Sequence, residues 1–388
     1  MHEIQWLIVF LRVLHVVAAA MWIGASFYII SWENKFNRTK GLATGIEGNF
    51  WTIQGGDFYY VEKLRDAPSQ LPEELHWFKY EAYVTWLSGF ALMCLVFYLT
   101  PGSMLISDNV FDISGPASVA ISLGSLLACW LAYDLYCRTP LAKNFQISAI
   151  LGLLLVGLFG YLFSLVFSQR AAFIHVGAVM GTIMSANVFF VIIPWHKRLI
   201  RAIDTQQSLE ELFAARPGFR SRHNHYMTLP VFFIMLGSHF PVAFNQPYSW
   251  VLLTAIVFAA GLLKHYHNLL QQKAASTGYL LAGVGILAAV IFATAPASIV
   301  NGDCGARVST EQAYAVVAES CRTCHSIAPT DATWTLPPIG VVFDTPEQVL
   351  ERKNRILQRA IVQQDMPPHD VAQLSLEQRN VLGCWAKQ

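Results

Sequence analysis

The chain has 388 residues, of which 54% are hydrophobic and only 13% are charged. An average soluble domain carries about 25% charged residues, so this composition excludes an ordinary soluble enzyme and indicates a membrane protein. The formal net charge is +1 at pH 7, which gives no indication of a nucleic-acid partner.

Apolar segments long enough to cross the roughly 30 Å hydrocarbon core of a membrane recur along the first three quarters of the chain. They fall near residues 4–30, 80–100, 116–136, 146–168, 171–194, 227–244, 249–268 and 277–299. The first is not a removable signal peptide, because no basic region precedes it and its apolar run is too long. We therefore predict an all-α fold with an eight-helix transmembrane bundle over residues 1–300 and a small separate domain over 301–388.

Positive side chains concentrate in alternate loops. The segment 31–79 and three later loops carry many Lys and Arg residues, Lys264 and Lys273 among them, whereas the other loops between helices hold only Arg170. The positive-inside rule assigns the basic loops to the cytoplasm and both chain ends to the opposite side. Residues 31–79 form a long cytoplasmic loop, longer than a connection needs, so we expect it to carry structure and function of its own.

The motif Cys321-Arg322-Thr323-Cys324-His325 is typical of covalent c-type haem attachment. Each thiol can add to one haem vinyl group while the histidine binds the iron. A disulfide pair or half of a zinc site is the alternative, but no second Cys-x-x-Cys or His-x₃-His follows. Because haem is attached to such proteins outside the cytoplasm, this motif and the charge pattern both predict a multi-pass protein of a bacterial inner membrane with its N-terminus and tail domain in the periplasm.

The residues around the motif predict a small class I cytochrome c. Three segments open with a hydroxyl residue and a Gln three positions later, the signature of a capping box, and these begin at Ser309, Thr345 and Ser375. Met366 is the expected second axial ligand, with His369 as the rival. Cys304 and Cys384 either form a disulfide that closes this domain or stay free.

Ionisable side chains in the membrane segments form a second group of candidates, because each costs about 2.5 kcal/mol or more at the bilayer centre. The histidines fall into an outer layer and an inner layer, and those that we consider as ligands of a b-type haem or another cofactor are His15, His175, His239, His225 and His265. The alternative is that they are core or interface residues. Arg12 either neutralises an anion, such as a haem propionate or a substrate, or pairs with a carboxylate.

The long loop offers a third group. Gly55 and Gly56 permit close backbone approach to a flat ligand, Phe58 and Tyr59 can stack on it, and Lys79 can pair with an anion. The alternative is an aromatic belt at the membrane interface with a snorkelling lysine. The similar segments that begin at His15 and His175 also allow an internal duplication into two parallel four-helix repeats.

Together these parts resemble one family, the membrane-bound urate oxidase (urate hydroxylase) of bacteria. The resemblance covers nearly the whole chain and rests on the order of the domains and on the stretches Arg12-x-x-His15 with Trp22-x-Gly24, Gly55-Gly56-x-Phe58-Tyr59, Trp77-Phe78-Lys79-x-Glu81 and Met366-Pro367-Pro368.

The resemblance implies an enzyme that oxidises urate to 5-hydroxyisourate and passes electrons to its own cytochrome without forming hydrogen peroxide. Soluble cytochrome c or a terminal oxidase is then the expected electron acceptor. Arg12 and the 31–79 loop are candidates for binding urate, and Glu81 or a histidine for the base. The alternative is a membrane-anchored electron-transfer subunit that relays electrons from quinol or a partner dehydrogenase.

Overall fold

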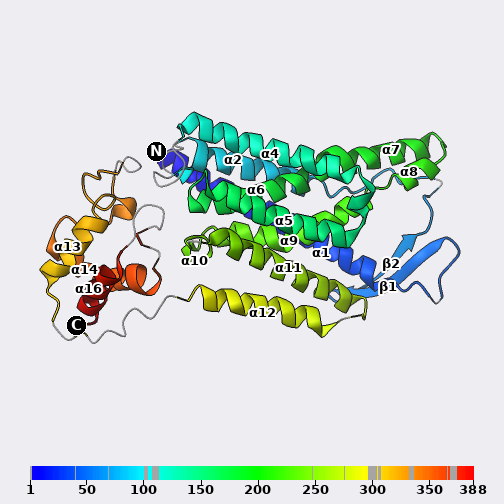
Figure 1. The fold of residues 1–388 in the computed structure, drawn as a ribbon. Helices are drawn as coiled ribbons and strands as arrows, with labels where there is room; N and C mark the ends of the chain where they lie inside the picture. Colours follow the sequence, from blue (N-terminus) through cyan, green and yellow to red (C-terminus); the bar gives the residue numbers. More distant parts are fainter. Residues whose placement is uncertain are drawn as a thin grey trace.

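The structure is a computed structural model. It describes residues 2–39, 41–68, 70–99, 104–106, 113–246, 248–274, 276–295, 304, 307–331, 336–364, 366–367 and 374–388. Figure 1 shows an elongated helical region with a small helical domain at one end, beside the N-terminus, and a β-hairpin at the other end. The two ends of the bundle are therefore occupied by segments of different kinds.

Helices dominate the first three quarters of the chain. In order they are α1 (His2–Lys35), α2 (Tyr80–Met93) with its π-helical extension η1 (Cys94–Tyr98), α4 (Gly115–Cys137), the short 3₁₀ helix η2 (Pro140–Lys143), α5 (Phe145–Ser164), α6 (Gln169–Ala186), the π-helical η3 (Asn187–Ile192), α7 (Ile193–Asp204), α8 (Glu210–Ala214), α9 (Gly218–Gly237), α10 (Pro241–Phe244), α11 (Ser249–Gln271) and α12 (Thr277–Ala293). Several begin at side-chain caps: Ser114, Asn144 and Ser168 accept hydrogen bonds from backbone N–H groups in the first turns of α4, α5 and α6.

Length and composition support a multi-pass membrane protein. Within the described residues, six helices are long and apolar enough to cross a bilayer: Glu3–Lys35, Tyr80–Tyr98, Gly115–Cys137, Phe145–Ser164, Gln169–Asp204 and Ser249–Gln271. The predicted spans 227–244 and 277–299 coincide with α9 and α12, which do not meet this criterion. Helix α9 carries arginine and histidine in its first turns and ends at Gly237, and α12 has 17 residues. The prediction of eight spans is thus supported for six.

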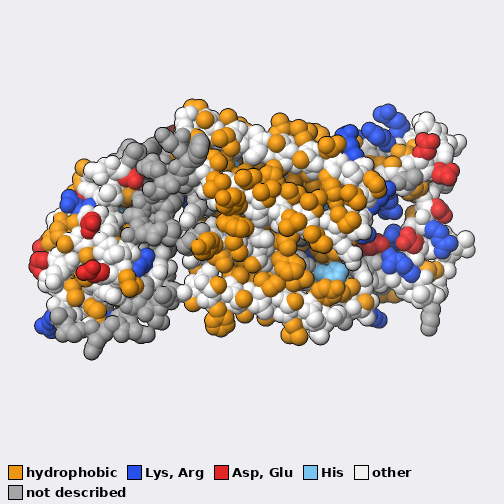
Figure 2. Space-filling model, in the orientation of Figure 1, with side chains coloured by type: hydrophobic (Ala, Val, Ile, Leu, Met, Phe, Trp, Pro, Cys, Tyr) orange, Lys and Arg blue, Asp and Glu red, His pale blue; other side chains and the backbone are white. Residues whose placement is uncertain are grey.

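Figure 2 shows hydrophobic side chains covering the middle of the helical region, with lysine and arginine gathered at the end that carries the hairpin, α7 and α8. The N-terminus and the tail domain lie at the other end. This distribution agrees with the charge asymmetry of the sequence, and the assignment of the basic end to the cytoplasm stays a prediction.

The prediction of an all-α fold was wrong for the 31–79 loop, which forms an antiparallel β-hairpin. Strand β1 (Ile46–Gln54) pairs with β2 (Asp57–Leu64), and Gln54 faces Asp57 at the tip. Gly55 and Gly56 form the two-residue turn with φ angles of +61° and +97°. Two consecutive positive φ values match a type I′ hairpin turn, which favours glycine at both positions.

Ion pairs anchor the hairpin to the end of α1. Lys63 Nζ lies 2.9 Å from Glu33 Oε1 and 3.1 Å from Glu47 Oε1, and Arg38 contacts Glu33 at 2.6 Å. The hydrogen bond from Lys63 lowers the pKa of Glu47 below its usual range. Lys63 is therefore part of the anchor between the strands and α1.

The core of the helical region is centred on α6, which packs against α4, α5 and α9. Phe167, Ile234 and Leu253 are almost completely buried there. Helix α11 packs against α5, α9 and α12, and α1 packs mainly against α2. Most of the first helix is consequently covered on one side only, and its large apolar residues are exposed, as suits a surface that faces lipid.

The tail domain consists of α13 (Thr310–Ser320), the 3₁₀ helix η4 (Pro338–Gly340), α14 (Pro346–Glu351), α15 (Lys353–Ile356), the π-helical η5 (Leu357–Val362) and α16 (Leu376–Lys387). The three predicted capping boxes are confirmed at the starts of α13, α14 and α16. Val317, Val349 and Leu382 form the centre of its separate core. Cys304 and Cys384, left open by the sequence, form a disulfide.

Candidate functional site

The Cys-x-x-Cys-His motif lies at the end of α13. Cys321 N–H donates to Val317 O at 2.8 Å, and His325 N–H donates to Cys321 O at 2.9 Å, so a turn of backbone continues the helix through the motif. Cys321 and Cys324 are free thiols. Burial raises the pKa of Cys321 to about 12, which keeps this thiol protonated.

The His325 ring is oriented by its neighbours. Its Nδ1 lies 3.1 Å from Val341 O, and because a carbonyl only accepts, Nδ1 carries the hydrogen and Nε2 keeps its lone pair. Phe343 N–H donates to His325 O at 2.8 Å, and the two rings lie 5.4 Å apart. A second bond that fixes the tautomer and leaves Nε2 as acceptor is the usual support of a metal-binding histidine.

Asp344 holds the segment after the motif. Its Oδ2 accepts from Ile327 N–H at 2.9 Å, and its Oδ1 lies 3.4 Å from Arg322 Nε. The bond from Ile327 lowers the pKa of this carboxyl below its usual range, with help from Ser326 and Arg322. The carboxylate thereby ties the chain on both sides of His325 to the start of α14.

Met366 follows η5, is half-buried and donates its N–H to Arg359 O at 3.3 Å. The rival ligand, His369, lies outside the described residues, so the choice between them stays a prediction. Two free thiols three positions apart and an imidazole with an available Nε2 fit covalent haem c in their donor chemistry. Separately, among the described residues no cluster of three or more His, Cys, Asp or Glu side chains is arranged to hold a bare metal ion.

The three outer-layer histidines have different environments. His15 donates through Nδ1 to Thr85 O at 2.9 Å, and its ring packs on Gly89, where an added Cβ would lie 2.8 Å from Cε1. His175 is fully buried, with Nδ1 2.6 Å from Ala171 O and Nε2 2.6 Å from Ser122 Oγ. Both ring nitrogens of His175 are thus hydrogen-bonded within the protein. His239 is exposed just after the end of α9.

The two inner-layer histidines contact different groups. His225 Nε2 lies 3.1 Å from Asn268 Oδ1, and Nδ1 lies 3.5 Å from Ser26 Oγ. His265 Nδ1 lies 2.8 Å from Tyr226 Oη. Each imidazole therefore has a protein partner of its own, and the assignment of b-type haem to either layer stays a prediction.

The candidate residues of the 31–79 loop are divided between two places. Gly55 and Gly56 form the hairpin turn, and the strand residues Phe58 and Tyr59 are 74% and 47% exposed. These four residues belong to an exposed ribbon and not to an enclosed cavity. The turn conformation accounts for both glycines without a ligand.

Lys79 and Glu81 lie together at the start of α2. Lys79 Nζ contacts the faces of Trp77 and Tyr80, 4.7 and 4.9 Å from the ring centroids. Glu81 Oε2 is buried and has no hydrogen-bond partner in the described part of the chain. The role of the base, for which Glu81 and a histidine are the candidates, stays a prediction.

Arg12 is not near the hairpin. It lies on α1 and is exposed, and the hairpin follows the far end of that helix (Figure 1). Arg12 and Lys35 are separated by roughly 35 Å along the helix axis, at 1.5 Å per residue. Arg12 and the hairpin, both candidates for binding urate, therefore do not lie at one site in this structure.

Two buried charged residues were not predicted from the sequence. Lys264 was assigned to an inner loop, but it lies in α11 and is fully buried. Arg220 lies in α9, where it pairs with Asp134 at 2.7 Å and donates to Asn187 Oδ1 at 3.1 Å. The available signal for Lys264 was its position inside the predicted span 249–268, where a cation needs an explanation.

Comparison with known proteins identifies a family that matches most of the chain. The family described as "Urate oxidase N-terminal" matches residues 1–295, a region that contains the hairpin and every helix from α1 to α12 and excludes the Cys-x-x-Cys-His domain. No curated protein and no solved structure matches the chain. The match extends over well more than half of the sequence, and the chain therefore belongs to the urate oxidase N-terminal family.

Proposed function

We propose that this protein is a membrane-bound oxidoreductase that oxidises urate to 5-hydroxyisourate and delivers the electrons to a c-type haem on its own tail domain. The observation that carries the proposal is the joining, in one chain, of a urate oxidase family region over residues 1–295 to the motif formed by Cys321, Cys324 and His325. Urate and water give 5-hydroxyisourate, two protons and two electrons. The reaction therefore needs an electron exit, which the tail domain supplies.

The residues that would hold the haem are Cys321 and Cys324 through thioether bonds and His325 through Nε2. Met366 would take the second axial position, where a thioether raises the reduction potential. When bound, the haem iron accepts one electron at a time. The bond from His325 Nδ1 to Val341 O holds the imidazole plane in place and makes Nε2 more basic.

A one-electron carrier must be emptied twice for each urate molecule. A soluble cytochrome c or a terminal oxidase of the respiratory chain is the acceptor that fits this requirement, and no hydrogen peroxide forms, because oxygen is not the direct oxidant. The N-terminus and the tail domain lie at one end of the molecule and the basic segments at the other (Figures 1 and 2). This arrangement supports a bacterial inner-membrane protein with a periplasmic tail domain.

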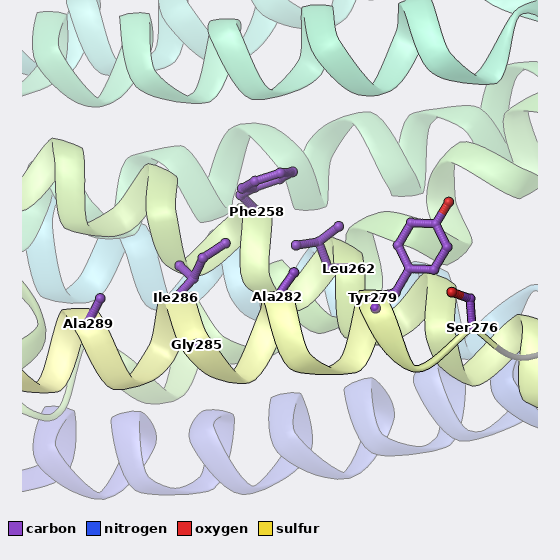
Figure 3. A pocket seen from close by; sticks show the side chains of 9 residues that line it. Phe258, Leu262, Ser276, Tyr279, Ala282, Gly285, Ile286 and Ala289 are labelled. Atoms are coloured by element: carbon purple, nitrogen blue, oxygen red, sulfur yellow. The ribbon is translucent and has the colours of Figure 1, made fainter.

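A second candidate function is a cytochrome subunit that relays electrons from quinol. It is favoured by an apolar groove of about 670 Å³ between α11 and α12 (Figure 3). Its lining residues are Phe258, Leu262, Ser276, Gly278, Tyr279, Ala282, Gly285, Ile286 and Ala289. The hydroxyl groups of Ser276 and Tyr279 at one end of an otherwise apolar groove suit an isoprenoid quinol.

A visible spectrum of the purified protein separates the two. If the proposal is correct, urate added in the absence of any other protein reduces a c-type α-band. Reduction by a quinol analogue and not by urate would favour the relay subunit instead. A pyridine haemochrome assay on the same sample counts b-type against c-type haem and so tests for the b-type haem whose candidate ligands are His15, His175, His239, His225 and His265.

A further inference from the structure

Lys264 is a buried cation without a counter-ion among the residues that the structure describes. Its side chain has no exposed surface, and its Nζ makes no hydrogen bond within the described residues. Lys264 Nζ lies over the face of the Phe27 ring, 2.9 Å from the ring centroid. The other buried cation of the helical region, Arg220, pairs with Asp134, so Lys264 differs from it in lacking an anion.

An ammonium group held only by an aromatic face is poorly compensated. Removal of a charge from water costs more than one cation–π contact offsets, unless an anion and hydrogen bonds complete the site. A carboxylate of the protein would normally supply that anion. None pairs with Lys264 in the part of the chain that the structure describes, so the missing anion is expected to come from outside the protein.

Polar side chains from three helices surround this lysine. Asn268 lies one turn farther along α11, and its Oδ1 is 3.1 Å from His225 Nε2 on α9. His225 Nδ1 is 3.5 Å from Ser26 Oγ on α1, and the His225 ring lies 5.7 Å from the ring of Phe27, over which Lys264 Nζ lies. We call the group formed by Ser26, Phe27, His225, Lys264 and Asn268 the Lys264 cluster.

Helices α1 and α11 run side by side in register at this level. Asn34 donates to Gln271 Oε1 at 3.1 Å across a sequence separation of 237 residues, and Phe27 and Lys264 have the same separation. The two contacts therefore lie on parallel helices about 10 Å apart along the axes, or seven residues. The Lys264 cluster consequently lies roughly two turns inside the end of the bundle that carries the hairpin.

A chain of polar groups connects that end to the cluster. Gln272 donates to Asn34 Oδ1 at 2.9 Å, Asn34 donates to Gln271, and Gln271 Nε2 lies 3.0 Å from His267 Nε2. The His267 ring lies 6.0 Å from the ring of Phe27 in the Lys264 cluster. Amide and imidazole groups in an otherwise apolar helix pair give a polar ligand hydrogen-bonding partners along the way inward.

We propose that the Lys264 cluster is the binding site for the urate monoanion, entered from the end of the bundle that carries the hairpin. This inference rests on the proposed function for the identity of the ligand. The site offers a cation, an amide, an imidazole and a hydroxyl group beside an aromatic face, which are the groups that bind a planar anion with polar edges. When urate binds, the Lys264 ammonium group leaves the face of Phe27 and pairs with the anion, and that face becomes available for stacking on the purine ring.

The direct test is the affinity of the purified full-length protein for urate, measured by equilibrium binding, in Lys264→Met. The expected result is a loss of about 30-fold or more, as found when one partner of a buried charge pair is removed. Binding of hypoxanthine, a neutral purine at pH 7, is expected to stay unchanged. The matched control is Lys197→Met, because Lys197 is an exposed lysine on α7, and it should bind urate as the unmodified protein does.

Stability distinguishes a binding role from a structural one. Removal of an unpaired buried charge breaks no ion pair, so the thermal midpoint of Lys264→Met without urate should equal or exceed that of the unmodified protein. A lower midpoint with unchanged urate affinity would overturn the proposal. If this variant does not fold, Asn268→Asp is the second variant, because a carboxylate at 268 gives Lys264 a partner inside the protein. It should fold and lose urate binding to the same degree, and normal affinity in it would contradict the site.

Failure of this site and failure of the proposed function give different results. If Lys264→Met binds urate normally and urate still reduces its haem, the site is wrong and the function stands. If the unmodified protein binds urate through Lys264 but its haem is not reduced, the site stands and the function is wrong. If the protein holds a b-type haem that disappears in His225→Ala, the cluster is a cofactor site and the proposal is overturned.

Discussion

The tail domain and the helical region encode their chemistry in different ways. In the tail domain, three thiol and imidazole side chains within five residues specify the site, and the capping boxes that start α13, α14 and α16 act over three residues each. In the helical region, Ser26 contacts His225 across a sequence separation of 199 residues, and Lys264 contacts Phe27, the neighbour of Ser26 on α1. The spacing of residues in the sequence predicts a site whose residues are neighbours in the chain. It does not predict a site formed by helices from distant parts of the chain.

The largest effect is expected from removal of the tail-domain thiols, which tests whether the two regions have separate roles. We expect Cys321→Ser combined with Cys324→Ser to abolish covalent haem and urate-driven electron delivery, because thioether attachment needs sulfur. Urate binding by the helical region should persist. Haem staining after denaturing electrophoresis and equilibrium urate binding measure the two properties.

The control for that experiment is Cys94→Ser, which changes a free thiol in the helical region and should retain haem and electron delivery. If the double variant kept a covalent haem, or lost urate binding together with haem, the two regions would not be separable in the way described.

A smaller effect is expected from crowding the contact between α1 and α2. In Gly89→Ala, the added Cβ would lie 2.8 Å from Cε1 of His15. Because the ring must shift and its bond to Thr85 O is strained, the variant should lose about 1–3 kcal/mol of stability. Thermal unfolding in detergent measures the change.

Gly24→Ala is the matched control, since nothing lies within 4 Å of a Cβ added at Gly24 on α1. Alanine is the better helix former, by about 1 kcal/mol, so this variant should be as stable as the unmodified protein or more stable. Equal destabilisation of both variants would show that His15 is not fixed against Gly89.

The hairpin allows a test of whether its glycines serve a turn or a ligand. Gly56 has a φ of +97°, so Gly56→Ala should destabilise the turn by about 1–3 kcal/mol. Hydrogen exchange of the backbone amides of β1 and β2 should accelerate while urate affinity stays normal. Loss of urate affinity with unchanged exchange would instead assign Gly56 to ligand binding.

The smallest effect concerns the pH dependence of the tail domain. The folded-state pKa of Asp344 is depressed, chiefly by the hydrogen bond from Ile327 N–H. Its contribution to stability is therefore complete above the unfolded-state value, about 3.9, and is lost as the pH falls through the folded-state value. Asp344→Asn should lower the thermal midpoint of the tail domain slightly at pH 7, and the difference from the unmodified protein should shrink toward zero in strong acid. A difference that is independent of pH would contradict the role of the carboxylate.

Most of the fold followed from the sequence. The predicted spans coincide with helices because a helix satisfies all backbone hydrogen bonds of a twenty-residue apolar segment within that segment. The predicted capping boxes form because their hydrogen bonds join residues only three positions apart. The hairpin was missed because the long loop was interpreted through its glycines and aromatics as a ligand surface, although Gly55-Gly56 between β-rich segments is also a turn signal.

The candidate site in the helical region was less accessible to sequence reasoning. His175 was expected inside a membrane span and His225 at the inner end of a helix, but the groups that they contact depend on which helix faces meet. Lys264 was counted among loop residues because a lysine near a helix end usually reaches the interface. Only the packing of α11 against α9 and the register of α1 beside it show that this lysine points inward.

The central claim is that one chain takes two electrons from urate and transfers them to its own c-type haem. It is tested most directly by anaerobic titration of the oxidised, purified protein with urate, following the c-type α-band. The account predicts that each urate consumed reduces the c-type haem of two protein molecules, by one electron each. A band that stays oxidised with urate but is reduced by dithionite would contradict it, and so would urate consumption that begins only after oxygen is admitted and that releases hydrogen peroxide.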